Sequence, residues 1–472
     1  MKKIKLLLII LSLTLTCKKS DYVFTPFLIP LLDPNSITES KLEDLVQVSN
    51  SDYNLNENGI VTQDTIIRWW NNWNLNRPNN IRGKLILLHI AETSPSGIYL
   101  RPKEVNGVYS YLVNNAESIF RESRFTGVFT LPHLLPTGGK VQNFLREYNI
   151  NPTEDLIVLI PDGSANEKLF SLCFRIWHIL RYWGIDHRNL AVLNGGRADL
   201  SFPANLVNNF LSDKVGGSFN LPSLRRDNTV LQTTNQDLFT FLRTNRFLNS
   251  NSKVYIIDAR TNLEFTIDRS QNWAYSSRAA SPWYGDITKF LPMEGRINQA
   301  LNLPSADFLE DIGSGKRLKS FNAIQNEINS KVSAAIVRSD RFIVYSRNGI
   351  RSSLVGFILQ AVVGYPTSYY DNGWTEWSLS SGRATQSSNS LPFDSPWRTD
   401  FSELTQPSSP FVYNADYTPE VGAANVQKFT ILFSEAFSRS SDEHKKADKA
   451  FINNRASSGA TSLPSRPGNP CG

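Results

Sequence analysis

Cysteine is scarce in this chain of 472 residues, which contains only Cys17, Cys173 and Cys471. Cys173 shares a helical face with Leu169 and Ile176, a spacing typical of a small side chain buried in a core. Cys471 lies in a tail rich in Pro, Gly and Ser, which would have to dock before a disulfide could form. We therefore expect no structural disulfide, and since no His and Cys pair has ligand spacing, no metal site either.

Other functional signatures are missing too. Neither half of the chain has Gly-x-Gly-x-x-Gly after its first apolar run, so no dinucleotide site and no cofactor are expected. Gly-x-Ser-x-Gly, the nucleophile elbow of many hydrolases, is absent as well. The net charge is +6, and the removable N-terminal segment holds three of those charges, which leaves +6 − 3 = +3. So small an excess of positive charge predicts no nucleic-acid partner.

The N-terminus has the pattern of a secretory leader. Residues 1–16, "MKKIKLLLIILSLTLT", begin with basic residues and continue in an uncharged stretch that is shorter than a bilayer span. Cys17 follows directly, and this position resembles the lipid-modified cysteine of bacterial lipoproteins, with Leu15 and Thr16 in place of the commoner small residues. The resemblance implies a lipid anchor at Cys17 and a membrane-anchored protein in the periplasm, at the outer membrane or at the cell surface. An ordinary secreted protein and an uncleaved anchor are the alternatives.

Beyond the leader, the pattern of the chain indicates an α/β protein. Residues 17–57 are polar and rich in turn formers, typical of a tether. Apolar runs such as "KLILLHIA", "DLIVLI", "SKVYIIDAR" and "RFIVYS" then alternate with helical patterns, one of them at 62–73 with Thr62 as its N-cap. This alternation favours parallel βαβ units with helices on both faces of a sheet. We expect two doubly wound domains with mostly parallel sheets, at 58–215 and 236–380.

A linker at 216–235 joins the two predicted domains, because that stretch is rich in Gly, Asn, Pro and charged residues. Residues 381–472 form a C-terminal extension rich in Ser, Pro, Thr and Asn. This extension contains one helical pattern at 425–437 and is expected to be disordered at its end.

The stretch "FIVYSRNGIRSS", residues 342–353, is a strand, a tight polar loop and the start of a helix over 350–363. Backbone N–H groups of such a turn and of the first helical residues point at one spot and form an anion cradle. Ser346 occupies the first loop position, where a nucleophile would lie. Thiosulfate, sulfate, phosphate or an acidic side chain of a partner would be bound by Arg347, Asn348, Gly349, Ile350, Arg351 and Ser352. Alternatively, Arg351 is a surface residue that pairs with a nearby carboxylate.

Four stretches in the second half resemble tandem-domain rhodaneses, the thiosulfate or 3-mercaptopyruvate sulfurtransferases. They are Asp258 to Arg260, "GRINQALNLP", "SRNGIR" and "YYDNGWTEWS". The first half matches through "RFTGVFTLP", the run that ends at Pro161, and "VLNGG". The resemblance implies two rhodanese-like domains, the first of them degenerate.

In active members of this family, a cysteine at the first loop position attacks a sulfur donor and forms a persulfide. Ser346 holds that position here, Pro161 holds it in the first half, and Arg296 stands where the family has a substrate-recognition histidine.

These residues leave three kinds of function open. A serine hydroxyl cannot form a persulfide, so the favoured hypothesis is a catalytically silent rhodanese-like lipoprotein that binds a small anion or serves as a scaffold for an unknown protein partner. A thiosulfate or 3-mercaptopyruvate sulfurtransferase with residual or non-standard activity is the alternative. A third hypothesis makes Ser346 a hydrolase nucleophile, but none of the five histidines lies near it in the sequence.

Overall fold

A computed structural model of the chain describes residues 36–47, 59–244, 252–266, 296–332, 336–377, 380 and 442–453. Contacts divide the chain into Met1–Ser36 and a compact unit, Ile37–Gly472, to which all the elements below belong. The leader, Cys17, Cys471 and the expected helix at 425–437 lie outside the described residues. No helix among the described residues is both long enough and apolar enough to cross a bilayer.

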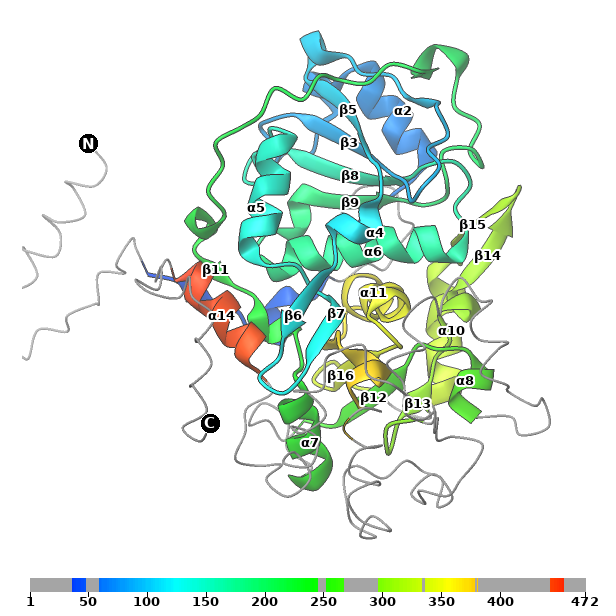
Figure 1. Ribbon diagram of the computed structural model, residues 1–472. Helices are drawn as coiled ribbons and strands as arrows, with labels where there is room; N and C mark the ends of the chain where they lie inside the picture. Colours follow the sequence, from blue (N-terminus) through cyan, green and yellow to red (C-terminus); the bar gives the residue numbers. More distant parts are fainter. Residues whose placement is uncertain are drawn as a thin grey trace, which may run out of the picture. The chain divides into compact units, whose positions relative to one another are not determined.

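The first half of the chain forms a sheet of five parallel strands in the order β2-β9-β8-β3-β5 (Figure 1). These strands are β2 (Ile60–Val61), β3 (Leu85–Ile90), β5 (Val108–Val113), β8 (Leu156–Pro161) and β9 (Leu190–Leu193). All residues of the central β3 and β8 are buried, as expected for strands covered on both faces.

The second half forms a sheet of four parallel strands in the order β13-β12-β16-β17. The strands are β12 (Val254–Asp258), β13 (Leu301–Asn302), β16 (Arg341–Tyr345) and β17 (Thr367–Tyr370). Since both principal sheets are parallel and covered by helices, the predicted α/β fold with mostly parallel sheets is confirmed.

Shorter pairs flank these sheets. Antiparallel pairs join β4 (Tyr99–Leu100) to β10 (Val207–Asn208), β6 (Glu122–Phe125) to β7 (Thr130–Leu134), and β14 (Leu309–Ile312) to β15 (Gly315–Leu318). A parallel pair joins β1 (Thr38–Glu39) to β11 (Arg226–Asp227). The predicted linker at 216–235 contains β11, two 3-10 turns, η5 (Leu221–Leu224) and η6 (Thr229–Leu231), and the first residue of α7.

The α-helices are α2 (Gln63–Asn71), α3 (Trp73–Asn76), α4 (Ala116–Ile119), α5 (Gly138–Glu147), α6 (Glu167–Tyr182), α7 (Asn235–Thr244), α8 (Asn262–Thr266), α10 (Phe321–Val332), α11 (Ile350–Phe357) and α14 (Glu443–Ile452). Further 3-10 turns are η1 (Leu42–Leu45), η2 (Glu104–Asn106), η3 (His187–Asn189), η4 (Ala204–Leu206) and η9 (Ser305–Phe308), and a π-helical turn, η10 (Ile358–Val362), extends α11. The Thr62 side chain accepts a hydrogen bond from the Thr65 backbone N–H, which confirms the predicted N-cap.

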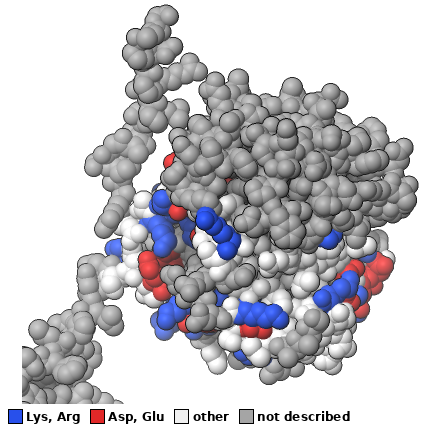
Figure 2. All heavy atoms as spheres, turned by 90° about the horizontal axis from the view of Figure 1, so that it is seen from below, with Lys and Arg blue, Asp and Glu red and all other residues white. Residues whose placement is uncertain are grey.

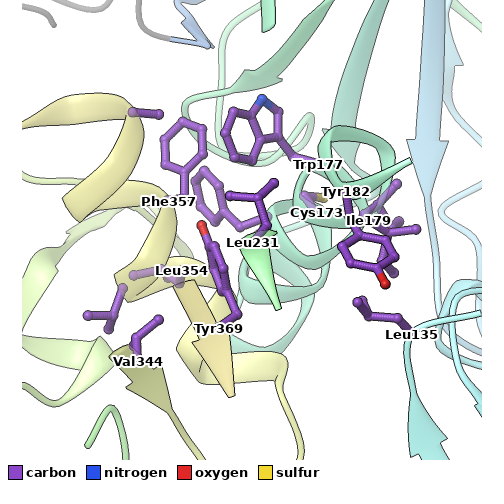
Figure 3. Packing of buried hydrophobic residues seen from close by; sticks show 14 of the residues in the cluster. Leu135, Cys173, Trp177, Ile179, Tyr182, Leu231, Val344, Leu354, Phe357 and Tyr369 are labelled. Atoms are coloured by element: carbon purple, nitrogen blue, oxygen red, sulfur yellow. The ribbon is translucent and has the colours of Figure 1, made fainter. Parts of the chain in front are cut away.

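Helix α6 packs against α11 and joins the two sheets through one apolar core (Figure 3). The Phe357 ring lies 4.5 Å from the Phe174 ring and 4.8 Å from the Trp177 ring, measured between centroids. Cys173 is a fully buried free thiol in this core, as its spacing predicted, and burial raises the pKa of that thiol well above its usual value. It is therefore an unreactive apolar group rather than a nucleophile.

Acidic and basic side chains are mixed on the surface. On the face shown in Figure 2, Lys and Arg lie among Asp and Glu over the described residues. Within the same residues, no group of three or more His, Cys, Asp and Glu side chains is arranged to hold a metal ion.

Candidate functional site

The loop that carries Ser346 leaves β16 and enters α11 within four residues. Gly349 makes this turn possible because its φ of 84° is in the left-handed region, which side chains with a Cβ adopt at a cost. Ser346 is 1% exposed, and its hydroxyl donates to Ser352 Oγ over 3.3 Å. The Ser353 hydroxyl donates to the Gly349 carbonyl over 2.6 Å and secures the first turn of the helix.

The predicted anion contacts, residues 347–352, do lie together around this turn. All of them are buried, with Arg347 3%, Asn348 8% and Arg351 6% exposed. Helix α11 begins directly after Gly349, and the backbone N–H groups of a helix's first turn point toward the segment that precedes it. The loop is thus a built strand-to-helix cradle, but it lies inside the protein rather than on its surface.

Both loop arginines are paired with one buried carboxylate, Glu264 of α8. Arg347 Nη2 lies 3.2 Å from Glu264 Oε1, and Arg351 Nη1 lies 2.5 Å from Glu264 Oε2. Burial by itself would raise the pKa of Glu264, but Arg351 and Arg347 outweigh it and hold that pKa well below its usual value. The three side chains together carry one net positive charge.

A second carboxylate lies beside Arg351. The Arg351 Nε lies 3.8 Å from Oε1 of Glu167, which is the first residue of α6. The alternative interpretation of Arg351 was therefore right about a carboxylate partner, whereas the expected surface position is wrong because two elements cover the side chain.

A different segment of the second half holds the loop from the opposite side. The Trp374 backbone N–H donates to the Ser346 carbonyl over 2.8 Å, and the Thr375 hydroxyl donates to the Arg347 carbonyl over 2.7 Å. Gly373 is required at this approach, because a Cβ on it would overlap the Ser346 carbonyl. The "YYDNGWTEW" stretch thus acts as a support that orients the loop.

The first half of the chain also contacts the loop, through the buried ion pair of Arg175 and Asp371. Arg175 Nη1 lies 2.5 Å from Asp371 Oδ1, and both side chains are at most 2% exposed. Gly349 packs directly against this pair, and a Cβ at its position would overlap both partners. Neither partner was predicted from the sequence, and nor was Glu264; a signal for Arg175 was an arginine within a helix whose residues are mostly apolar.

Beside the loop, the predicted Asp258 to Arg260 exit of β12 forms a closed buried network. Tyr345 OH donates to Asp258 Oδ2 over 2.6 Å, and Arg260 Nη2 lies 2.6 Å from the same oxygen. All three residues are fully buried. The motif therefore ties the ends of β12 and β16 together, which is a structural role.

Arg296, which the sequence resemblance predicts at the position of the family's histidine, lies next to α8. Its Nη1 donates to the Phe265 carbonyl over 3.3 Å, and its guanidinium lies 4.5 Å from the centroid of the Phe265 ring. Its described contacts are thus with the residue that follows Glu264.

The corresponding loop of the first half has a different chemistry. Pro161 ends β8, and the Asp162 carboxylate that follows accepts hydrogen bonds from the Ser96 backbone N–H (2.6 Å) and hydroxyl (2.7 Å). The Ala165 backbone N–H in the same loop donates to Asp199 Oδ2 over 2.8 Å. Carboxylates of the protein thus occupy this loop, which leaves the second-half loop as the candidate site.

No described hydrogen bond joins Ser346 to a histidine. Two buried histidines make contacts within the fold. The His178 ring stacks on the Tyr369 ring with 3.6 Å between centroids, and His89 Nε2 accepts a hydrogen bond from the Leu100 backbone N–H. Burial lowers the pKa of His89 to about 3 and that of His178 well below its usual value. Without a base at Ser346, the described geometry does not support a hydrolase.

Residues 244–380 match the family model of the rhodanese-like domain. This rhodanese-like segment contains the whole loop with Ser346, Glu264 and the supporting stretch with Trp374. No curated protein matches the chain.

Solved structures that are similar to the chain include sulfur-transferring enzymes. The 3-mercaptopyruvate sulfotransferase SseA of Escherichia coli is 18% identical, with 67% of this chain and 98% of that chain covered and a TM-score of 0.41. The anaerobic ergothioneine biosynthesis enzyme of Chlorobium limicola is 16% identical, with coverage of 70% and 69% and a TM-score of 0.45. The 3-mercaptopyruvate sulfurtransferase of Leishmania major is 16% identical, with coverage of 63% and 74% and a TM-score of 0.36.

Proposed function

We propose that this protein is a rhodanese-like lipoprotein that transfers no sulfur and whose second-half loop is retained as a scaffold with weak affinity for small anions. The observation that carries the proposal is the buried hydroxyl of Ser346 at the first loop position, hydrogen-bonded to Ser352. A persulfide requires a sulfur nucleophile, and the one described thiol, Cys173, is buried within α6. The sulfur atom that would carry the persulfide is therefore missing at the first position of this loop.

The electrostatics of the loop support weak rather than strong anion binding. Arg347 and Arg351 would supply two charge-assisted hydrogen bonds to thiosulfate, sulfate or phosphate, but Glu264 already accepts from both. An incoming anion must compete with that carboxylate and must reach a buried turn. We expect saturable binding with a Kd on the order of 1 mM or weaker, about −4 kcal/mol.

Residual sulfur transfer is the alternative, and the match of residues 244–380 to the rhodanese-like family favours it. Assays of thiosulfate:cyanide transfer and of 3-mercaptopyruvate turnover decide between the two. Under our proposal, the wild-type protein shows no turnover above the buffer rate. Turnover by the wild-type protein above that rate would overturn the proposal, and a Cys173→Ser variant would then show whether the turnover uses the described thiol.

The Ser346→Cys variant tests the cradle itself. Two arginines and the helix N-terminus favour a thiolate at that position, so the new thiol should react with iodoacetamide at a pH below the usual thiol pKa of ~8.5. Ser171→Cys is the matched control: Ser171 is fully buried in α6 and its hydroxyl makes no hydrogen bond to the described residues, so burial should keep a thiol there protonated. Equal reactivity of the two variants would show that the loop gives a thiol no more access and no more thiolate character than the interior of α6 does, which would contradict the anion cradle.

The membrane location is a further part of this proposal, and it rests on the leader and Cys17. One acyl chain gives only marginal attachment, whereas the several chains of a lipoprotein hold a protein stably at a membrane. The protein partner of such a scaffold would meet it at the periplasmic or external face of that membrane.

A further inference from the structure

Helix α14 is docked on elements of the first half of the chain and of the 216–235 stretch, which lie far from it in the sequence (Figure 1). Its buried side chains, His444, Asp448 and Ile452, are spaced four residues apart and form one face. Lys446 lies on the opposite side and is 62% exposed. The helix packs against β6, α5, β11 and the turns η5 and η6.

The docking depends on a specific polar contact at its centre. Arg124 of β6 donates twice to the Asp448 carboxylate, over 2.7 Å and 3.0 Å, and Tyr182 OH donates to it over 2.9 Å. Arg124 and Asp448 are at most 7% exposed, so their pairing takes place away from water. Phe451 adds an apolar contact, with its ring 5.6 Å from that of Trp183.

Hydrogen bonds continue from this contact to the loop with Ser346. Arg124 Nη1 also donates to the Leu135 carbonyl over 3.1 Å, and the Leu135 backbone N–H donates to Asp371 Oδ2 over 2.8 Å. Asp371 is the partner of Arg175 in the ion pair against which Gly349 packs. Every side chain of this relay is buried.

We propose that α14 is a clasp that sets the conformation of the Ser346 loop through this relay. The physical reason is that the Arg124–Asp448 and Arg175–Asp371 ion pairs are both buried. Removing one partner of either pair would leave an unpaired charge inside the protein, which is strongly unfavourable. If α14 undocks, the Arg124 side chain must hydrogen-bond to water or to another acceptor. When Arg124 moves, its hydrogen bond to the Leu135 carbonyl is lost, and that bond positions Leu135 against Asp371. The loop then loses the support of the Arg175–Asp371 pair and keeps the hydrogen bonds from the Trp374 segment. This inference does not depend on whether the loop binds anions.

The test uses the full chain with a reporter thiol at position 346, introduced by Ser346→Cys. Alkylation by iodoacetamide is followed at single residues by mass spectrometry, and Cys173, fully buried in α6, reports global unfolding in the same molecule. Asp448→Asn removes the carboxylate by which α14 pairs with Arg124 of β6, and Lys446→Ala alters the exposed side of the same helix as the matched control. Arg124→Lys is a milder second variant that keeps the charge but loses the planar fork.

We expect Asp448→Asn to raise the alkylation rate at position 346 about tenfold or more, equivalent to about 1.4 kcal/mol, while Cys173 stays protected. Arg124→Lys should give a smaller increase, and Lys446→Ala none. The proposal is wrong if the rate at position 346 is unchanged in both variants of the pair, or if it rises only together with the rate at Cys173.

Discussion

Replacing Glu376 by glutamine should remove a pH dependence of stability from this protein. Glu376 lies in the segment that supports the loop and is fully buried. Tyr370 OH donates to its Oε2 over 3.2 Å, and the Asn372 side-chain amide donates to the same oxygen. Burial dominates these hydrogen bonds and raises the pKa of Glu376 from 4.5 to about 7.

The sign of the effect follows from which state holds the proton. Between pH 4.5 and 7 the folded protein keeps the Glu376 proton, whereas the unfolded chain has released it. The free energy of unfolding therefore falls as pH rises through this window. The two values differ by 2.5, and at ~1.36 kcal/mol for each pKa unit the loss is about 3 kcal/mol.

Urea unfolding at pH 5 and pH 8, followed by tryptophan fluorescence, measures this loss. The buried histidines His89 and His444, whose pKa values are lowered to about 3, act in the opposite sense and stabilise the fold as pH rises. Their contribution cancels when wild type and Glu376→Gln are compared, and Glu310→Gln, at a side chain that is 40% exposed, serves as control. An equal change in stability between pH 5 and pH 8 in wild type and Glu376→Gln would refute the reasoning.

Two further predictions address the loop and the anchor. Gly349→Ala should destabilise the fold by about 3 kcal/mol or more, because it strains the left-handed turn and displaces the buried Arg175–Asp371 pair. Chemical denaturation checks this, with Gly139→Ala, where a Cβ meets nothing, as the control; equal stability of the two variants would contradict the packing. Cys17→Ala should move the protein from the detergent phase to the aqueous phase in a phase-partition experiment. If the partition is unchanged, Cys17 is not the site of lipid attachment.

Local patterns were sufficient for much of the fold. The runs at β3, β8, β12 and β16 are apolar over most of their length, which predicts strands buried on both faces and hence parallel sheets. The capping role of Thr62 and the burial of Cys173 follow from short-range chemistry, and the structure confirms both.

Other features were missed because their cause is not local. Helix α14 has a polar composition in sequence, and only the seat provided by β6 and Tyr182 makes His444, Asp448 and Ile452 a buried face. The partners of its central contact, Arg124 and Asp448, are 324 residues apart. No pattern within α14 indicates such a partner.

The chemistry of the loop in the candidate site could be predicted from local residues alone: a serine in place of a thiol, two arginines, and a glycine at the turn into a helix. Those are properties of residue types and of spacing over a few positions, which local geometry decides. Three features of the site become visible only in the folded chain. Glu264 pairs with both arginines, the Arg175–Asp371 ion pair packs against Gly349, and the loop is buried. Each of these facts depends on which distant side chains share a low-dielectric interior, where a charge must find an opposite charge or a hydrogen-bond partner.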